Sequence, residues 1–255
     1  MPDCTRRDFA ETILKSLTLY SFVGAAISSQ AMDSALRTEA RVWAAQIDEI
    51  SIDLRARRLT PIKWQEAVEG VLGNIDLPEL LTRIDLAKFQ HSLNVPDGGA
   101  SSKKLDFRKV LGMPDGLRYN TAIFGMRKGR SIVPHGHHNV VSGHLVIQGN
   151  LHVRNYERLG DEDDTLIIRP TIDKIISVRD CSSQSSSRNN IHWFTALSST
   201  AFTFDVIVQY LDPDQPCGRD YVDPLHAQKL SDGNLRVRRL QQDDAENMYG
   251  GSDHH

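Results

Sequence analysis

Cysteine is scarce in this chain, which has three among 255 residues, at positions 4, 181 and 217. Cys181 and Cys217 are compatible with a disulfide in an oxidising compartment and equally with two free thiols, and their spacing leaves both alternatives open. None of the three has the C-x-x-C spacing of paired metal-binding cysteines. The sequence therefore gives no support for a zinc module built on thiolates.

The chain also lacks an excess of charge of one sign. Its 30 Lys and Arg residues against 33 Asp and Glu give a net charge of -3, with a pI of about 6.4. Such a balance provides no broad attraction to nucleic acid or to anionic membranes, so a small-molecule or peptide partner is favoured. A hydrophobic content of 40% over 255 residues suffices for a buried core, which we expect in one main domain with additions.

Long hydrophobic runs are missing as well, and the mildly apolar stretch at residues 14–27 is too short and too polar to span a membrane. It follows Arg6-Arg7 and leads into small residues. Together these features are typical of a bacterial twin-arginine export signal over residues 1–31, and the alternative is an amphipathic helix that stays attached. The signal predicts a periplasmic or otherwise exported protein with no membrane association in its mature form, and the attached helix predicts a cytoplasmic one.

Residues 32–100 have the periodicity of helices. Apolar residues recur at alternating steps of four and three between Leu36 and Leu54. Thr60-Pro61 is typical of a helix start, because Thr caps the free amides and Pro fits the first helical position. We therefore expect a helical region whose apolar faces pack on the next domain.

From residue 101 the apolar period shifts to two, which indicates strands. Short strands joined by glycine-bearing turns, without intervening helices, favour an antiparallel sandwich or barrel over residues 101–222. Gln148-Gly149-Asn150 predicts a hairpin between two of them. The acidic residues 160–164 and the serine-rich residues 182–189 are expected as loops. The expected strands cover residues 117–127, 131–137, 142–147, 151–156, 165–167, 174–178, 190–196 and 201–210.

The last part of the chain, residues 223–255, has a different pattern. Asp232-Gly233-Asn234 within residues 230–240 predicts a C-terminal hairpin. The segment from Gln241 is polar and is expected to be a disordered tail, so its histidines are poor ligand candidates.

The histidines are concentrated in the expected barrel. His135 and His137 are two apart on an expected strand, so they point to one face and are suited to bind one metal ion. With Gly129 before them and Gly149 after them, they resemble the first motif of the cupin family. That pattern usually has an acidic ligand at the position of Ser142, and the resemblance then implies a third ligand from the second cupin motif, at His192.

A set of three histidines without a carboxylate resembles the cupin thiol dioxygenases, in particular the 2-aminoethanethiol dioxygenase and plant cysteine oxidase type. The stretch from Asn190 through Asp205 to Gly218-Arg219-Asp220 is similar to these enzymes, and the resemblance covers roughly residues 117–222. It implies a mainly β, cupin-type double-stranded β-helix (jelly-roll) barrel, here with an N-terminal helical region. It further implies iron(II), with zinc, nickel or manganese as alternatives, and oxidation of a small thiol or an N-terminal cysteine to the sulfinate by dioxygen.

Further residues are expected to act beside the metal. Asp205 matches an acidic residue of the plant branch, and Tyr210 matches a tyrosine near the thiol. The two would face opposite sides of an unbroken strand, so both serve the site only if the strand bends. His144 is expected to point inward near the metal, or else to be a hydrogen-bonded core residue, whereas His138 is expected to face away.

The missing carboxylate also allows a function without turnover. In that alternative the protein is a non-catalytic metal-binding cupin that acts as a small-molecule or redox sensor. A further alternative keeps the barrel but uses zinc or nickel for isomerisation or hydrolysis.

Overall fold

The computed structural model describes residues 29–92, 99–106 and 116–251. The chain divides into two units, Met1–Leu36 and Arg37–His255, and the packing described below lies within the second. The expected export signal lies outside the described residues, except for its last three residues, which belong to the first helix. None of the described helices is long and apolar enough to cross a membrane.

The helical region predicted before residue 100 is present. It consists of α2 (Ser29–Arg55), α3 (Pro61–Gly73), α4 (Leu77–Ile84) and α5 (Leu86–Ser92). Helix α3 begins as predicted, because the Thr60 side chain accepts a hydrogen bond of 3.3 Å from the Lys63 amide and Pro61 is its first residue. The start of α3 therefore follows the local capping rules that the sequence indicated.

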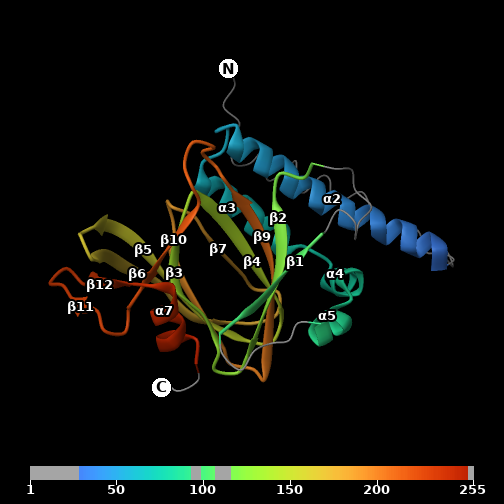
Figure 1. Cartoon of the computed structure of the whole chain (residues 1–255). Helices are drawn as coiled ribbons and strands as arrows, with labels where there is room; N and C mark the ends of the chain where they lie inside the picture. Colours follow the sequence, from blue (N-terminus) through green and yellow to red (C-terminus); the bar gives the residue numbers. More distant parts are fainter. Residues whose placement is uncertain (1–28, 93–98, 107–115, 252–255) are drawn as a thin grey trace. The chain divides into compact units, whose positions relative to one another are not determined.

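Twelve strands, β1 to β12, form two antiparallel sheets among the described residues (Figure 1). One has the order β1-β2-β9-β4-β7 and the other β10-β3-β8-β5-β6-β12-β11. The strands are β1 (Ser101–Leu105), β2 (Asn120–Arg127), β3 (Ser131–His138), β4 (Val140–Gln148), β5 (Leu151–Asp161), β6 (Thr165–Ile176), β7 (Cys181–Gln184), β8 (Ile191–Ala196), β9 (Thr200–Gln209), β10 (Gly218–Val222), β11 (Gln228–Lys229) and β12 (Leu235–Leu240).

The eight strands β2 to β9 have jelly-roll connectivity. Strands β2, β9, β4 and β7 are neighbours in one sheet, and β3, β8, β5 and β6 are neighbours in the other, so the chain passes back and forth between the sheets. This is the double Greek-key arrangement of jelly rolls and cupins. The predicted mainly β, cupin-type barrel with an N-terminal helical region is confirmed at the level of fold.

The prediction of a hairpin at Gly149 is wrong. Strand β4 pairs with β9 and β7, whereas β5 pairs with β6 and β8, so this turn carries the chain from one sheet to the other. Gly149 has a φ of +75°, and a Cβ there would lie 2.4 Å from the Thr200 carbonyl oxygen. The turn needs glycine for both reasons, but turn chemistry does not determine which strands then pair.

The serine-rich segment is the second difference. Its first residues form β7, which the sequence did not indicate because CSSQ has no apolar alternation. Its side chains are instead held by polar groups of α3: Gln65 donates to the Ser183 hydroxyl at 3.1 Å, and the Ser185 hydroxyl donates to the Gln65 carbonyl oxygen at 2.7 Å. Cys181, at the start of β7, and Cys217 are both free thiols.

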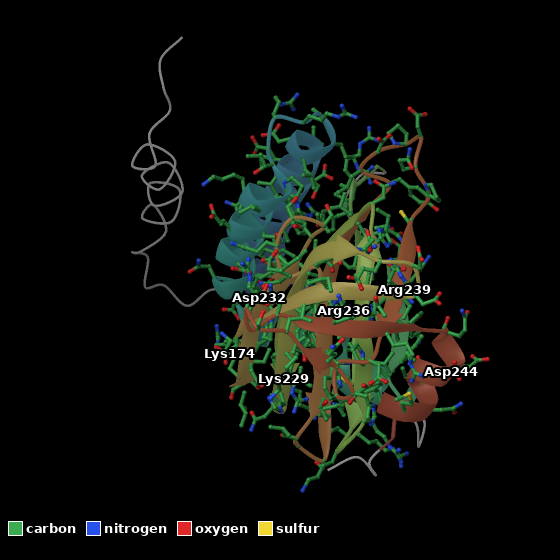
Figure 2. The ribbon with its side chains drawn as sticks, turned by 90° about the vertical axis from the view of Figure 1, so that its left-hand side faces the viewer. Lys174, Lys229, Asp232, Arg236, Arg239 and Asp244 are labelled. Atoms are coloured by element: carbon green, nitrogen blue, oxygen red, sulfur yellow. The ribbon has the colours of Figure 1, made fainter. Side chains whose placement is uncertain are left out.

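The barrel also extends past the predicted boundary at residue 222. The predicted C-terminal hairpin is present as β11 and β12, but β12 additionally pairs with β6 and β10 and so closes a ring of six strands. Arg236 and Arg239 of β12, labelled in Figure 2, make ion pairs of 2.7 Å each, with Glu162 and Asp161. The C-terminal hairpin is therefore part of the barrel sheet.

The segment expected as a disordered tail contains α7 (Gln242–Tyr249). Ala245 and Tyr249 are its buried residues, and they pack with Val133 and Trp193 of the barrel. The Tyr249 hydroxyl also donates a hydrogen bond to Asp223. Two apolar contacts in an otherwise polar helix leave little periodic signal in the sequence, which is why composition alone suggested disorder.

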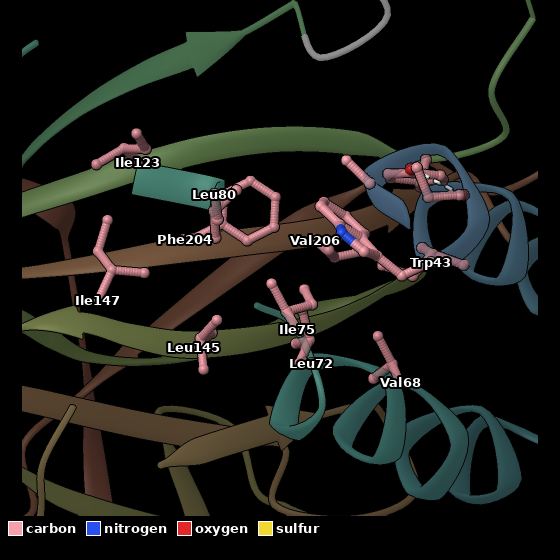
Figure 3. Packing of buried hydrophobic residues seen from close by; sticks show 14 of the residues in the cluster. Trp43, Val68, Leu72, Ile75, Leu80, Ile123, Leu145, Ile147, Phe204 and Val206 are labelled. Atoms are coloured by element: carbon pink, nitrogen blue, oxygen red, sulfur yellow. Dashed lines mark hydrogen bonds between the residues drawn. The ribbon is translucent and has the colours of Figure 1, made fainter. Parts of the chain in front are cut away.

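The largest apolar cluster joins the helical region to the first sheet (Figure 3). It contains Val68 and Leu72 of α3 together with Leu145 of β4 and Phe204 of β9, all of them at most 1% exposed. A smaller cluster between the two sheets includes Phe194 and Val153. The predicted docking of the helices on the barrel is confirmed, and it fixes β4 from its outer side.

Candidate metal centre

Three histidines meet on the inner face of the second sheet. His135 on β3 and His192 on β8 are direct cross-strand partners, and His137 follows two residues later on β3. Cross-strand partners point to the same face, as do residues two apart, so the sheet itself brings these imidazoles together. A register shift between Ile132 and His135 turns β3 at this point.

The imidazoles are close enough to share one ion. Their candidate ligand atoms all lie within 4.8 Å of one another, and the Nε2 atoms of His135 and His137 are 3.1 Å apart. The ring centroids of His135 and His192 are separated by 4.3 Å, and those of His137 and His192 by 5.3 Å. The structure thus brings together the three residues that the sequence singled out as metal ligands.

Burial keeps these imidazoles neutral. It is the main cause that lowers the pKa of His135 to about 4 and the pKa values of His137 and His192 well below their usual range. The Nδ1–H of His135 donates to the Val133 carbonyl at 2.8 Å, which leaves Nε2 as the lone pair available to a metal. Neutral imidazole is the form that binds first-row divalent ions.

Ser142 occupies the position at which a cupin carboxylate was expected. It is 3% exposed, and its hydroxyl has no hydrogen-bond partner among the described residues. Its cross-strand partner is Gln184, so its side chain lies on the inner face of β4. Within the described part of the chain, the cluster consists of the three histidines and includes no carboxylate.

A second buried pair lies beside the cluster. Nδ1 of His144 is 2.8 Å from Oδ2 of Asp205, and their side chains are 5% and 1% exposed. The two atoms are in close contact but are not aligned for a hydrogen bond. The His144 ring centroid is 5.7 Å from that of His192. The expectation that His144 and Asp205 lie near the cluster is therefore met in the structure.

Gln184 links the pair to the cluster, although the sequence gave no sign of it. Its amide nitrogen contacts Nε2 of His144 and lies 3.5 Å from Nε2 of His192. Only the fold reveals this residue, because β7 was not predicted. In the sheet Gln184 is the direct cross-strand partner of Ser142, which is distant from it in the sequence. The amide can hold both rings in one orientation.

The remaining candidates lie elsewhere. Tyr210 follows the last residue of β9, has a φ of +54°, is 56% exposed, and its amide donates to Sγ of Cys217 at 3.2 Å. The structure therefore does not place it with the histidines, because the chain leaves the strand before Tyr210 instead of bulging within it. His138 faces away as expected and pairs with Asp220.

The inner face fits a bound ion and its ligands. Several buried polar atoms there make no hydrogen bond to the described residues: the hydroxyl of Ser142, Nδ1 of His192, both oxygens of Asp205 and the side-chain oxygens of Asn155 and Gln184. Buried polar groups are nearly always satisfied, so this concentration calls for a further polar species. A divalent metal ion with bound solvent or substrate meets that requirement, and His135, His137 and His192 would hold it.

Comparisons with known proteins give similarity of fold only. No protein-family model and no curated protein sequence matches the chain. Among solved structures it is similar to procruciferin, an 11S globulin from Brassica napus, with 15% identity and a TM-score of 0.37 over 51% of this chain and 29% of that one. KdgF from Halomonas sp. shares 16% identity at a TM-score of 0.31, over 46% of this chain and 84% of that one.

An oxalate oxidase is also similar, with 17% identity and a TM-score of 0.35 over 49% of this chain and 56% of that one. The chain thus matches less than a third of procruciferin and just over half of this oxidase. Similarities of this size assign neither a substrate nor an activity.

Proposed function

We propose that the protein is an iron(II)-dependent thiol dioxygenase that converts a small thiol or an N-terminal cysteine to the sulfinate. The observation that carries this proposal is the cluster of three neutral histidines with Ser142 in place of a carboxylate. A bound iron(II) ion would supply the redox chemistry and a full dipositive charge that favours the thiolate form of the substrate.

The proposed reaction balances without a further reductant. Sulfur in the thiol loses four electrons, dioxygen accepts four, and both oxygen atoms enter the sulfinic acid. What the protein must provide is a place for the thiol proton and a fixed orientation of the ligands.

His144 is the proton acceptor in this proposal, and Asp205 positions it. Nδ1 lies 2.8 Å from the Asp205 carboxylate, whose negative charge favours the tautomer with its proton on Nδ1 and with Nε2 as the basic nitrogen. The amide of Gln184 contacts that Nε2 and also lies near His192, so it ties the acceptor to the metal ligand. Both His144 and Asp205 are almost fully buried, which excludes bulk water from the proton transfer.

Oxygen uptake tests the proposal. Protein loaded with iron(II) should consume dioxygen with a thiol substrate and yield a product heavier by both oxygen atoms. His192→Ala should abolish the uptake, whereas His138→Ala, which removes a histidine that faces away from the cluster, should retain it. Asp205→Asn should keep the metal but lower kcat by about 10- to 100-fold, as expected for loss of a group that orients a proton acceptor.

Two results would contradict the proposal. Unchanged oxygen uptake in the His192→Ala protein would show that the cluster is not the reaction site. Bound metal without oxygen uptake across cysteamine, cysteine and peptides that begin with cysteine would instead support a metal-binding protein that acts as a sensor.

A further inference from the structure

His137 lies at the point where the pairing of β3 with β8 ends. The last cross-strand partners of these two strands are Gly136 and Ile191, and β8 begins at Ile191. His135 and His192, by contrast, are partners within the paired segment. The β3–β8 ladder therefore fixes two of the proposed ligands and leaves the third, His137, just beyond its end.

The side chain of Asn190 continues the connection where the ladder stops. The same register, extended by one residue, places Asn190 opposite His137. Its side-chain amide donates a hydrogen bond of 2.8 Å to the carbonyl oxygen of His137 and one of 3.4 Å to that of Ser185. Asn190 is 3% exposed, and its Oδ1 makes no hydrogen bond to the described residues. Turning the amide over would direct Oδ1 at two carbonyl oxygens, so the NH2 group is the side that faces the backbone.

The surroundings of Asn190 are built to hold this amide. The Ser185 hydroxyl donates to the side-chain oxygen of Gln65 on α3 at 2.7 Å and accepts from the Ser187 amide at 3.1 Å, so the second acceptor of Asn190 belongs to an anchored segment. On the side of β3, a Cβ at Gly136 would lie 2.5 Å from Oδ1 of Asn190. Glycine at this strand position therefore leaves the space that the amide needs.

We infer that Asn190 is a positioning residue that fixes His137 as a metal ligand. The inference rests on the metal site of the proposed function, and it assigns to Asn190 a contact with the backbone of a ligand and none with the ion. Without the amide, the His137 carbonyl loses its donor and the end of β3 is free to shift, whereas His135 and His192 keep their ladder. Loss of such an outer partner typically lowers metal affinity by about 10- to 100-fold.

Cobalt(II) titrations of the full chain without dioxygen test this inference, with the visible absorption of bound cobalt as the readout. Asn190→Ala should bind cobalt about 10- to 100-fold more weakly than the wild type. Asn189→Gly removes the neighbouring buried amide at a φ of +54°, where glycine fits, and should leave the affinity within about twofold. In the His137→Ala protein, Asn190→Ala should cause no further loss, because the amide acts through His137 alone.

Nuclear magnetic resonance of the metal-free protein gives a second readout. The imidazole resonance of His137 is assigned by its loss in His137→Ala. Asn190→Ala should broaden or shift this resonance while those of His135 and His192 keep their positions, because the ladder still holds these two residues. A role of Asn190 in general stability would instead change all three resonances alike.

Failure of this inference and failure of the proposed function give different results. Equal cobalt affinity of Asn190→Ala and the wild type, or the same loss with and without His137, overturns the role of Asn190 whatever the oxygen uptake shows. A loss that depends on His137, without oxygen uptake, supports Asn190 and contradicts the dioxygenase. If the wild type or the His137→Ala protein binds no cobalt, the imidazole resonances decide. A change confined to His137 supports the inference, and no change, or an equal change in all three, overturns it.

Discussion

Gly143 on β4 is the point where α3 lies against the strand that carries His144. A Cβ at Gly143 would lie 3.0 Å from Cγ1 of Val68 and 3.3 Å from Cδ1 of Leu72, both closer than the 3.4–4 Å of ordinary contact. These two side chains are at most 1% exposed, so neither has room to turn toward solvent. We therefore predict that Gly143→Ala lowers the free energy of unfolding by about 1–3 kcal/mol, as is typical of overpacking.

Gly143→Ala should no longer destabilise the protein when Val68 is replaced by alanine. Val68→Ala alone should cost about 2 kcal/mol, because it removes buried methyl groups and leaves a small cavity. The added methyl group of Gly143→Ala then enters the space vacated by Val68. In that background Gly143→Ala should be neutral or stabilise the protein by up to about 1 kcal/mol, since it restricts the unfolded chain.

Urea unfolding measures this double-mutant cycle. Trp43 and Trp64 both lie in the apolar cluster that contains Val68, so tryptophan fluorescence reports the loss of that packing. The reasoning predicts a coupling free energy of at least about 1 kcal/mol between the two substitutions. Additive effects, or a Gly143→Ala protein as stable as the wild type, would refute the packing of α3 on β4.

Three further predictions concern the turn, a thiol and the metal. Gly149→Ala should lower the melting temperature by at least about 4 °C, because alanine is strained at this positive φ and its Cβ would clash with the Thr200 carbonyl oxygen. Calorimetry on the wild type and the variant measures this difference. Burial raises the pKa of Cys181 to about 12, so only a small fraction of this thiol is thiolate at pH 8.5. Alkylation of Cys181 at that pH should therefore be roughly a thousandfold slower in the folded protein than in urea, as measured by peptide mass spectrometry. The melting temperature of the wild type should be about 5–11 °C lower after removal of the metal by a chelator than with free metal at about 100 times Kd. The His192→Ala protein should have the same melting temperature under both conditions.

Strand parity explains why much of the site was predictable. His135 and His137 share a face because they are two residues apart, and His144 points inward for the same reason two residues after Ser142. The second-motif resemblance added His192, which the fold then places directly opposite His135. These inferences need only local strand geometry and a family pattern.

The parts that sequence reasoning missed depend on pairing between distant strands. Gln184 was missed because β7 is held by polar contacts and lacks an apolar signature. Tyr210 was placed at the site on the expectation of a bent strand, but β9 ends one residue before it. Long-range register has no signal in the local sequence.

Metal content of the protein as purified tests the central claim most directly. We predict about one divalent ion per chain for the wild type and for His138→Ala, and at least about tenfold less for His192→Ala, because loss of one of three ligands opens the site. Inductively coupled plasma mass spectrometry on the three proteins, prepared side by side, gives the answer. Metal-free wild type, or equal metal in all three, would contradict a metal centre formed by His135, His137 and His192.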